Sequence, residues 1–223
     1  MADREAKDAL YEGFAEVAKA LASGRRAELV DLLAQGERPV EHIAGEIGQS
    51  VANTSHHLRA LARAGLVTTR RDGTRIFYAL ASDRVADLWS AMQQVAAEHL
   101  AGLHALAGAY LGSREGIEVI GRDELLTRLR RGEVVVLDVR PAAEYAAGHI
   151  AGARSVPVTE LQHHLRALPP DVEVVAYCRG PYCVYADEAV RELTRQGLRA
   201  WRLAGGYPEW KRAGLPVAAG EGG

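Results

Sequence analysis

The stretch Tyr177-Cys178-Arg179-Gly180-Pro181-Tyr182-Cys183 holds both cysteines of this 223-residue chain. An apolar run over residues 172–177 leads into it, and a helical pattern over 185–196 follows it. A strand, a tight loop and a helix start form an anion-binding arrangement, because the loop amides and the helix N-terminus carry partial positive charge. We expect Cys178, at the head of this loop, to have a lowered pKa and to be a nucleophilic thiolate. The alternative is a buried cysteine that ends a core strand.

The composition is that of a globular protein long enough for two domains, with 48% hydrophobic and 25% charged residues. No apolar stretch approaches a membrane span, and residues 1–24 are too charged for a signal peptide. Two cysteines do not make a secreted disulfide framework. We therefore expect a cytoplasmic protein with free thiols and no membrane association.

Charge is concentrated in one segment of a chain whose net charge is only −2. Between residues 59 and 75, five arginines stand against the single acid Asp72. Such a segment is a candidate phosphate-facing patch, and the alternative is a solvated arginine face. The arginines are Arg59, Arg63, Arg70, Arg71 and Arg75.

The first half of the chain predicts helices over 3–21, 25–33, 39–47 and 51–64. Gly48-Gln49 forms the turn before the last of these, and Ser50 is a good N-cap. We expect Val51, Leu58, Leu61 and Ala62 to face inward, with a polar, basic face opposite. Two short helices joined by a glycine-containing turn form the helix-turn-helix pattern.

Strands over 66–71 and 74–80 are predicted next, joined by a two-residue Asp72-Gly73 turn. Arginines cluster at the tip, so the hairpin would act as a basic wing. A long helix is predicted over 82–111. With the first helix, its apolar stripe would form the two-fold interface that two DNA half-sites require. A simple capping helix is the alternative.

Three stretches resemble the ArsR family of dimeric winged helix-turn-helix repressors. They are Ser55-His56-His57-Leu58-Arg59-Ala60-Leu61, Ala64-Gly65-Leu66-Val67 and Arg71-Asp72-Gly73-Thr74. The resemblance covers residues 8–110 and implies a homodimer that binds double-stranded operator DNA. With the arginines of the helix and wing, the expected DNA-binding residues are Asn53, Ser55, His56, His57, Arg59, Arg63, Arg70, Arg71 and Arg75.

Metal sensing is common in that family, through a Cys-x-Cys segment before the recognition helix. The corresponding residues 37–43 contain no cysteine. A second family site uses the long helix, and only Glu98, His99 and His104 stand in its middle here. We therefore expect no metal site.

Strands alternate with helices in the second half, which favours an α/β domain with a mostly parallel sheet. Predicted strands cover 117–120, 133–139, 172–177 and 198–203, and predicted helices cover 122–131, 159–167, 185–196 and 208–213. Ligands bind where such strands end in loops, as the run before Cys178 does. The expected domains are 1–111 and 117–217, with a polar connector over 112–116 and a flexible tail over 218–223.

This half resembles a single-domain rhodanese over residues 117–217. The matching phrases are Leu137-Asp138-Val139-Arg140, Glu144-Tyr145, Gly148-His149-Ile150, Gly152-Ala153, the Cys178–Cys183 loop, Gly205-Gly206-Tyr207, Trp210 and Gly214-Leu215-Pro216-Val217. The resemblance implies that Cys178 becomes a persulfide cradled by loop amides, without a cofactor. The expected catalytic loop is Cys178, Arg179, Gly180, Pro181, Tyr182 and Cys183, and Asp138, Arg140, Glu144 and His149 are expected to form a structural network in which Arg140 and Glu144 could pair.

The loop length separates related chemistries. A cysteine phosphatase or arsenate reductase needs Cys-x5-Arg, and Val184 stands where that arginine would be. Sulfurtransferases of the family often end the loop with a cation that holds thiosulfate, and here that position is Cys183. Arg179 is the alternative source of charge. Cys183 either attacks the Cys178 persulfide, forming a disulfide or polysulfide bridge, or is inert.

The two halves together predict a sulfur- or redox-responsive transcriptional regulator, acting as a repressor, whose partners are operator DNA and a sulfane sulfur donor or thiol acceptor. One alternative is a rhodanese-type sulfurtransferase with Cys178 as nucleophile, which the winged domain only localises or dimerises. Another is an arsenic-responsive repressor that uses the two cysteines.

Overall fold

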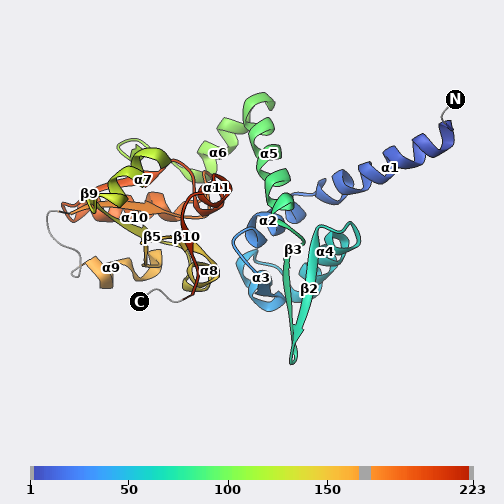
Figure 1. The fold of residues 1–223 in the computed structure, drawn as a ribbon, viewed down its shortest axis with the longest axis horizontal. Coiled ribbons are helices and arrows are strands. Elements are labelled where there is room, and N and C mark those ends of the chain that lie inside the picture. Colours follow the sequence, from blue (N-terminus) through green and yellow to red (C-terminus); the bar gives the residue numbers. More distant parts are fainter. Residues whose placement is uncertain (1–2, 166–171, 221–223) are drawn as a thin grey trace. The chain divides into compact units, whose positions relative to one another are not determined.

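The computed structural model describes residues 3–165 and 172–220 and divides into two compact units, Met1–Val95 and Ala96–Gly223 (Figure 1). The first combines helices with a small antiparallel sheet, and the second is an α/β domain built on a parallel sheet. The predicted fold class, a winged helix-turn-helix domain followed by a rhodanese-like α/β domain, is confirmed. Every helix of the described part is too short or too polar to cross a bilayer.

The first unit is mainly helical around one apolar core. Leu29, Ile43 and Leu58 are fully buried in it. Its helices are α1 Arg4–Leu21, α2 Gly24–Leu33, α3 Val40–Glu46, α4 Val51–Arg63 and α5 Asp83–His99, which runs past the boundary of the unit. Its strands β1 Arg38–Pro39, β2 Val67–Asp72 and β3 Arg75–Leu80 form an antiparallel sheet in the order β1-β3-β2.

Helices α3 and α4 form the helix-turn-helix. The predicted cap is confirmed, because Ser50 Oγ accepts a hydrogen bond of 3.2 Å from the Asn53 amide. The inward face differs from the prediction at its start, since Val51 is 44% exposed while Thr54 is fully buried. Val51 opens the first turn, and the core is reached only from the second turn onward.

The wing is the β2–β3 hairpin, and its turn lies one residue later than predicted. Asp72 pairs with Arg75, so the two-residue loop is Gly73-Thr74. Gly73 has a φ of +59°, which glycine adopts without the strain of a side chain. Pro39 also differs from the prediction. It lies in β1, where it pairs with Phe77 of β3, and it is the N-cap of α3 instead of a residue of its first turn.

The prediction of a single long helix over 82–111 is wrong. Helix α5 ends at His99 and α6 Leu103–Leu111 begins after a break at Gly102, whose φ is +86°. The apolar stripe continues on both sides of the break, which is why the periodicity hides it.

In the second unit, α6 is followed by alternating strands and helices. The helices are α7 Arg122–Arg130, α8 Ala142–Ala147, the 3-10 turn η1 Val158–Glu160, α9 Leu161–His164, α10 Tyr185–Arg195 and α11 Tyr207–Arg212. The strands are β4 Glu118–Ile120, β5 Val134–Asp138, β6 His149–Ile150, β7 Arg154–Ser155, β8 Glu173–Tyr177, β9 Arg199–Leu203 and β10 Val217–Ala218. Residues 166–167 of the predicted helix over 159–167 lie outside the described residues, as do residues 221–223 of the predicted tail.

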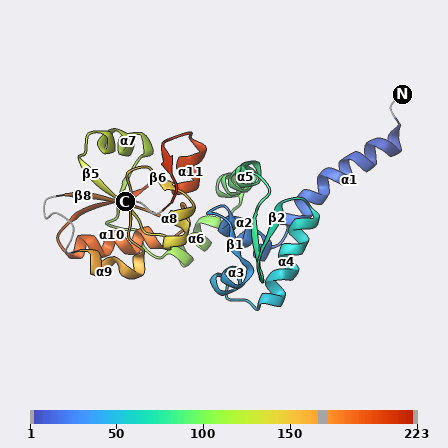
Figure 2. The same ribbon diagram turned by 60° about the horizontal axis from the view of Figure 1, so that its bottom comes forward.

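Five parallel strands form the central sheet in the order β4-β9-β8-β5-β7. Helices α9 and α10 cover one face, while α7 and α11 cover the other (Figure 2). Strand β8 lies in the middle, so its residues alternate between two buried layers. Tyr177 enters the layer under α11, and Cys178 enters the layer under α10. Strands β6 and β10 form a separate antiparallel pair, in which Ala218 of the predicted tail lies opposite His149.

Candidate functional site

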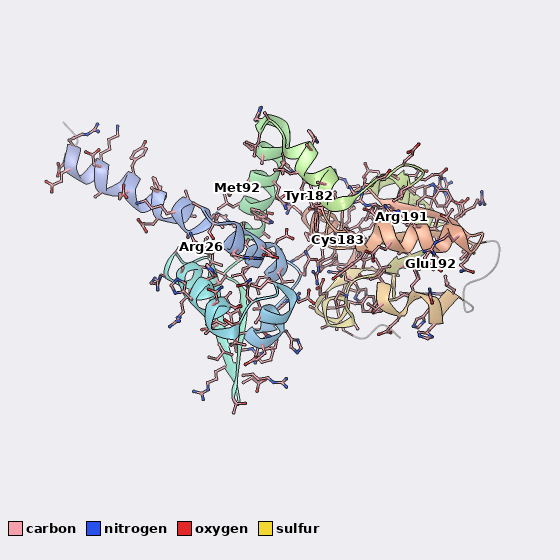
Figure 3. The ribbon with its side chains drawn as sticks, turned by 180° about the vertical axis from the view of Figure 1, so that it is seen from behind. Arg26, Met92, Tyr182, Cys183, Arg191 and Glu192 are labelled. Carbon is pink, nitrogen blue, oxygen red and sulfur yellow. The ribbon has the colours of Figure 1, made fainter. Side chains whose placement is uncertain are left out.

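The cysteine loop connects the end of β8 to the start of α10, and Figure 3 labels Tyr182 and Cys183 just before that helix. Gly206 supports the loop from the side. The Tyr207 amide donates to the Cys178 carbonyl over 3.1 Å. A Cβ on Gly206 would lie 2.4 Å from both the Cys178 oxygen and the Gly180 nitrogen, so only glycine lets the two backbones approach this closely.

A buried polar network fixes the strand ends beside the loop. The Asp138 carboxylate at the end of β5 accepts from Arg140 Nε over 2.9 Å and from the Tyr177 hydroxyl over 2.6 Å. Tyr177 in turn accepts from the Ile150 amide. Burial opposes the charge on Arg140, but Asp138 outweighs it and the pKa of Arg140 is raised. The network thus holds the residue directly before Cys178.

His149 and Tyr145 contact each other in a second buried cluster. Their rings stack with centroids 3.6 Å apart, and His149 Nδ1 lies 2.8 Å from the Tyr145 carbonyl oxygen. Both residues are buried. These contacts are the structural role expected for His149.

The two cysteines are free thiols that share a hydrogen bond. Cys178 is fully buried, and burial raises its pKa well above the ordinary value, helped by Cys183 and opposed by the Gly180 and Ala186 amides. Cys183 is half-buried, and the hydrogen bond from Cys178 lowers its pKa despite burial. Of the two thiols, Cys183 is therefore the one that loses its proton more readily.

The expectation that Cys178 itself has a lowered pKa is therefore wrong for the reduced loop. Its sulfur lies in the apolar layer under α10, where a charge is costly. The expected amides are present, but they divide between the sulfurs, with Arg179 and Tyr185 amides directed at Cys183.

The cation of the loop is already paired. Arg179 Nε lies 3.0 and 3.1 Å from the two oxygens of Glu144, whose side chain is 1% exposed. The guanidinium also lies over the Tyr185 ring, 5.3 Å from its centroid. This pairing offsets the charge of Arg179 within the fold.

Three charged residues behind the loop escaped the sequence reasoning. Asp187, fully buried in the first turn of α10, pairs with Arg114 Nε at 2.8 Å and with Arg202 Nε at 2.9 Å. The available signal was the acidic side chain at an inward position of α10 and the arginine at an inward position of β9. Arg114 gave no signal, because it stands in the connector.

Helix α4 presents the predicted DNA face only in part. Asn53, His56, Arg59 and Arg63 are exposed. Ser55 and His57 are half-buried, and Nδ1 of His57 has no hydrogen-bond partner among the described residues. Burial lowers the pKa of His57, with the charges of His56, Arg26 and Arg25 adding to the effect, so this ring is neutral at pH 7.

The wing arginines are exposed but not equivalent. Arg70 is held by Glu37 at 2.8 Å and lies over the Phe77 ring. Arg71 donates to the Gly73 carbonyl, and among the described residues no carboxylate lies within ion-pair distance of it. Arg75 faces Asp72 across the end of the hairpin.

Two helices of the first unit expose apolar side chains. On α1, Leu10, Tyr11 and Phe14 are 55%, 62% and 64% exposed. On α5, Leu88, Met92 and Val95 are 39%, 38% and 58% exposed. The described residues contain no group of three or more His, Cys, Asp or Glu side chains arranged to hold a metal ion.

Comparison with known proteins gives two family matches. Residues 23–69 match the family described as bacterial regulatory protein, arsR family, and residues 121–213 match the rhodanese-like domain. The HTH-type transcriptional regulator Rv0324 of Mycobacterium tuberculosis is 50% identical over 214 residues, covering 96% of this chain and 94% of that protein. The chain belongs to the arsR family of transcriptional regulators.

Both domains of the regulator have further relatives. A sulfurtransferase of Allochromatium vinosum is 36% identical over 108 residues, which are 48% of the regulator and 99% of that protein. A solution structure of the homodimeric winged helix-turn-helix DNA-binding domain, fragment 1–100, of Mb0332 from Mycobacterium bovis is 50% identical, with a TM-score of 0.42, and covers 45% of the regulator and 91% of that chain.

Proposed function

We propose that the regulator binds operator DNA as a homodimer in the cytoplasm, as a repressor, and that sulfur chemistry at Cys178 and Cys183 changes its affinity for DNA. The observation that carries the proposal is the pair of free thiols in a rhodanese-like loop, with Cys178 Sγ 3.7 Å from the Cys183 carbonyl oxygen, on the same chain as a winged helix-turn-helix. Because the thiol pair would itself respond to the sulfur signal, a DNA-binding domain attached to it needs no separate effector site.

The DNA face of the proposal combines α4 with the wing. Asn53, His56 and Arg59 supply polar and cationic groups on one exposed helix surface, suited to base edges and phosphates. Arg71 and Arg75 at the end of the hairpin supply phosphate contacts. Ser55, His57, Arg63 and Arg70 are proposed at the edges of this surface.

The dimer face of the proposal combines α1 with α5. Their exposed apolar side chains, among them Phe14 and Met92, form stripes that water solvates poorly. A second copy of the same stripes would cover them in a two-fold arrangement, which a palindromic operator matches.

The proposed chemistry begins with transfer of the Cys178 proton to the Cys183 thiolate. The Cys178 sulfur then attacks the outer sulfur of a persulfide R–S–SH, forming Cys178–S–SH and releasing R–S⁻. Cys183 next loses its proton and attacks Cys178 Sγ, which forms the Cys178–Cys183 disulfide and releases HS⁻. The two thiols are oxidised and the sulfane sulfur is reduced to sulfide. Because Arg179 is paired with Glu144, a persulfide is favoured over thiosulfate as the donor.

Binding measurements on the full chain test the proposal. A duplex selected from a random-sequence library by the reduced protein would be titrated by fluorescence anisotropy at fixed salt. We expect sodium tetrasulfide to change the Kd about fivefold or more, the lower end of common allosteric coupling. The C178S variant should bind the duplex but show no change. Equal affinities of treated and untreated wild type, with the Cys178–Cys183 bridge confirmed by intact mass, would contradict the proposal.

A second candidate is sulfur transfer as the main activity, with the winged domain localising or dimerising it. The similarity to a sulfurtransferase over 99% of that protein's length favours it. Steady turnover of a persulfide donor with a thiol acceptor would support this reading, whereas one adduct per chain without turnover would support the sensor. Arsenite belongs in the same panel, because a repressor that binds arsenic through both cysteines would respond to arsenite alone.

A further inference from the structure

Residues 112–116, which the sequence predicts to connect the two domains, lie in the second compact unit, where Arg114 bonds them to the cysteine loop. Arg114 Nε donates to Asp187 over 2.8 Å, and its Nη2 donates to the Pro181 carbonyl over 2.9 Å. Pro181 lies between the two cysteines. The side chain of Arg114 is 32% exposed, so the connector residue is partly covered by the loop it holds.

Asp187 joins this contact to the sheet. Its side chain is fully buried and also pairs with Arg202 of β9. Arg202 Nη2 reaches the Gly180 and Pro181 carbonyls, each at 3.3 Å. Two guanidinium groups, both paired with the Asp187 carboxylate, therefore donate to the loop carbonyls between Cys178 and Cys183, and one of them belongs to the connector.

The neighbours of Arg114 in the chain are also held. Arg191 lies on α10 and is labelled in Figure 3, and its Nη2 donates to the Ser113 carbonyl over 2.6 Å. The Ile117 amide donates to the Arg114 carbonyl. Helix α6 ends at Leu111. The conformation of the connector thus depends on contacts with the loop and with α10.

We propose that Arg114 couples the state of the Cys178–Cys183 pair to the conformation of the connector, which rests on the sulfur chemistry of the proposed function. Two hydrogen-bonded thiols must close to about 2.05 Å to form a disulfide, and an inserted sulfur would hold them further apart. Either product moves the loop backbone at Pro181. The Arg114 hydrogen bond tolerates only small displacements, so the bridge releases the connector from the loop.

Such coupling is reciprocal. If the bridged loop releases Arg114, then removing Arg114 changes the loop, and the reactivity of Cys183 changes with it. This converse effect appears in the reduced protein and needs no sulfur donor.

Hydrogen–deuterium exchange of the full chain and alkylation of Cys183 test the coupling together. In wild type bridged by sodium tetrasulfide, we expect exchange of peptides covering residues 112–117 to rise about fivefold or more over the reduced protein. Reduced R114Q should exchange there as fast as bridged wild type, and its Cys183 should react with iodoacetamide at a rate changed about fivefold. R114K keeps the charge without the two-pronged contact and replaces R114Q if that variant misfolds.

R191Q is the matched control, because it removes a connector contact that does not touch the loop. It should loosen the connector near Ser113 while Cys183 alkylates at the wild-type rate. Wild-type alkylation rates in R114Q and R114K would overturn the coupling. Intact mass separates the two proposals: if tetrasulfide forms no bridged species, the sulfur chemistry fails, and the alkylation rates of the reduced variants still decide the role of Arg114.

Discussion

Arg179 Nη2 lies 2.6 Å from Glu144 Oε1, so the arginine of the cysteine loop is neutralised within the fold. Charge on this arginine would otherwise attract a divalent anion such as thiosulfate. We therefore expect the loop to use thiosulfate poorly even though it keeps its arginine.

The E144Q substitution should therefore improve the use of thiosulfate. The amide keeps a hydrogen bond to Arg179 but removes the opposing charge, so we expect the KM for thiosulfate to fall about fivefold, equivalent to about 1 kcal/mol of added attraction. Steady-state transfer from thiosulfate to cyanide measures it. An unchanged KM in a folded E144Q protein would show that Arg179 does not meet the donor.

The C178A substitution should raise the pKa of Cys183. In wild type the hydrogen bond from Cys178 lowers that pKa, so the thiolate of Cys183 forms at a lower pH than that of an ordinary cysteine. Without the donor, the midpoint of iodoacetamide reactivity against pH moves upward. Identical profiles for C178A and wild type would contradict an effect of Cys178 on the pKa of Cys183. C183A is the companion variant, and its buried Cys178 should alkylate slowly.

The G206A substitution should destabilise the rhodanese-like domain by about 1–3 kcal/mol, the usual cost of forcing extra volume into a filled site. The added Cβ would meet the loop backbone at 2.4 Å. Urea denaturation followed by tryptophan fluorescence measures the change. G108A in α6 is the control, because open space surrounds that position and alanine suits a helix better than glycine. Equal midpoints for the two variants would count against the close approach.

The wing arginines should contribute unequally to DNA binding. R71Q removes a cation without a carboxylate partner in the described part of the chain, so the slope of log K against log salt should fall in magnitude by about 1 per protomer. R70Q should change the slope less, since Glu37 already offsets that charge. Salt titrations of the selected duplex give both values, and a larger effect of R70Q would reverse the assignment.

Local signals were enough to predict most elements. Ser50 announces the start of α4, and the alternation of apolar strands with helical segments predicts the parallel sheet. The loop between Cys178 and Cys183 stands at the end of a central strand, as the pattern indicated. In each case the signal is a short stretch of consecutive residues, even where the resulting sheet pairs distant strands.

What escaped prediction depends on segments distant in the chain. The raised pKa of Cys178 comes from burial in an apolar layer to which distant residues such as Leu137 and Leu161 contribute. The Arg114–Asp187 pair joins the connector to a helix that begins far downstream. The break at Gly102 was missed for a different reason, because its apolar flanks satisfy a helical period on either side.

If Arg114 couples the loop to the connector as proposed, its contact also determines where the rhodanese-like domain can be separated for fusion to another protein. The rhodanese-like match begins at residue 121, so a graft made at that border onto a foreign DNA reader would leave the arginine behind. A graft that starts at Ser113 would carry it along. In a chimera joined at residue 121, the state of the two cysteines should therefore no longer affect DNA binding.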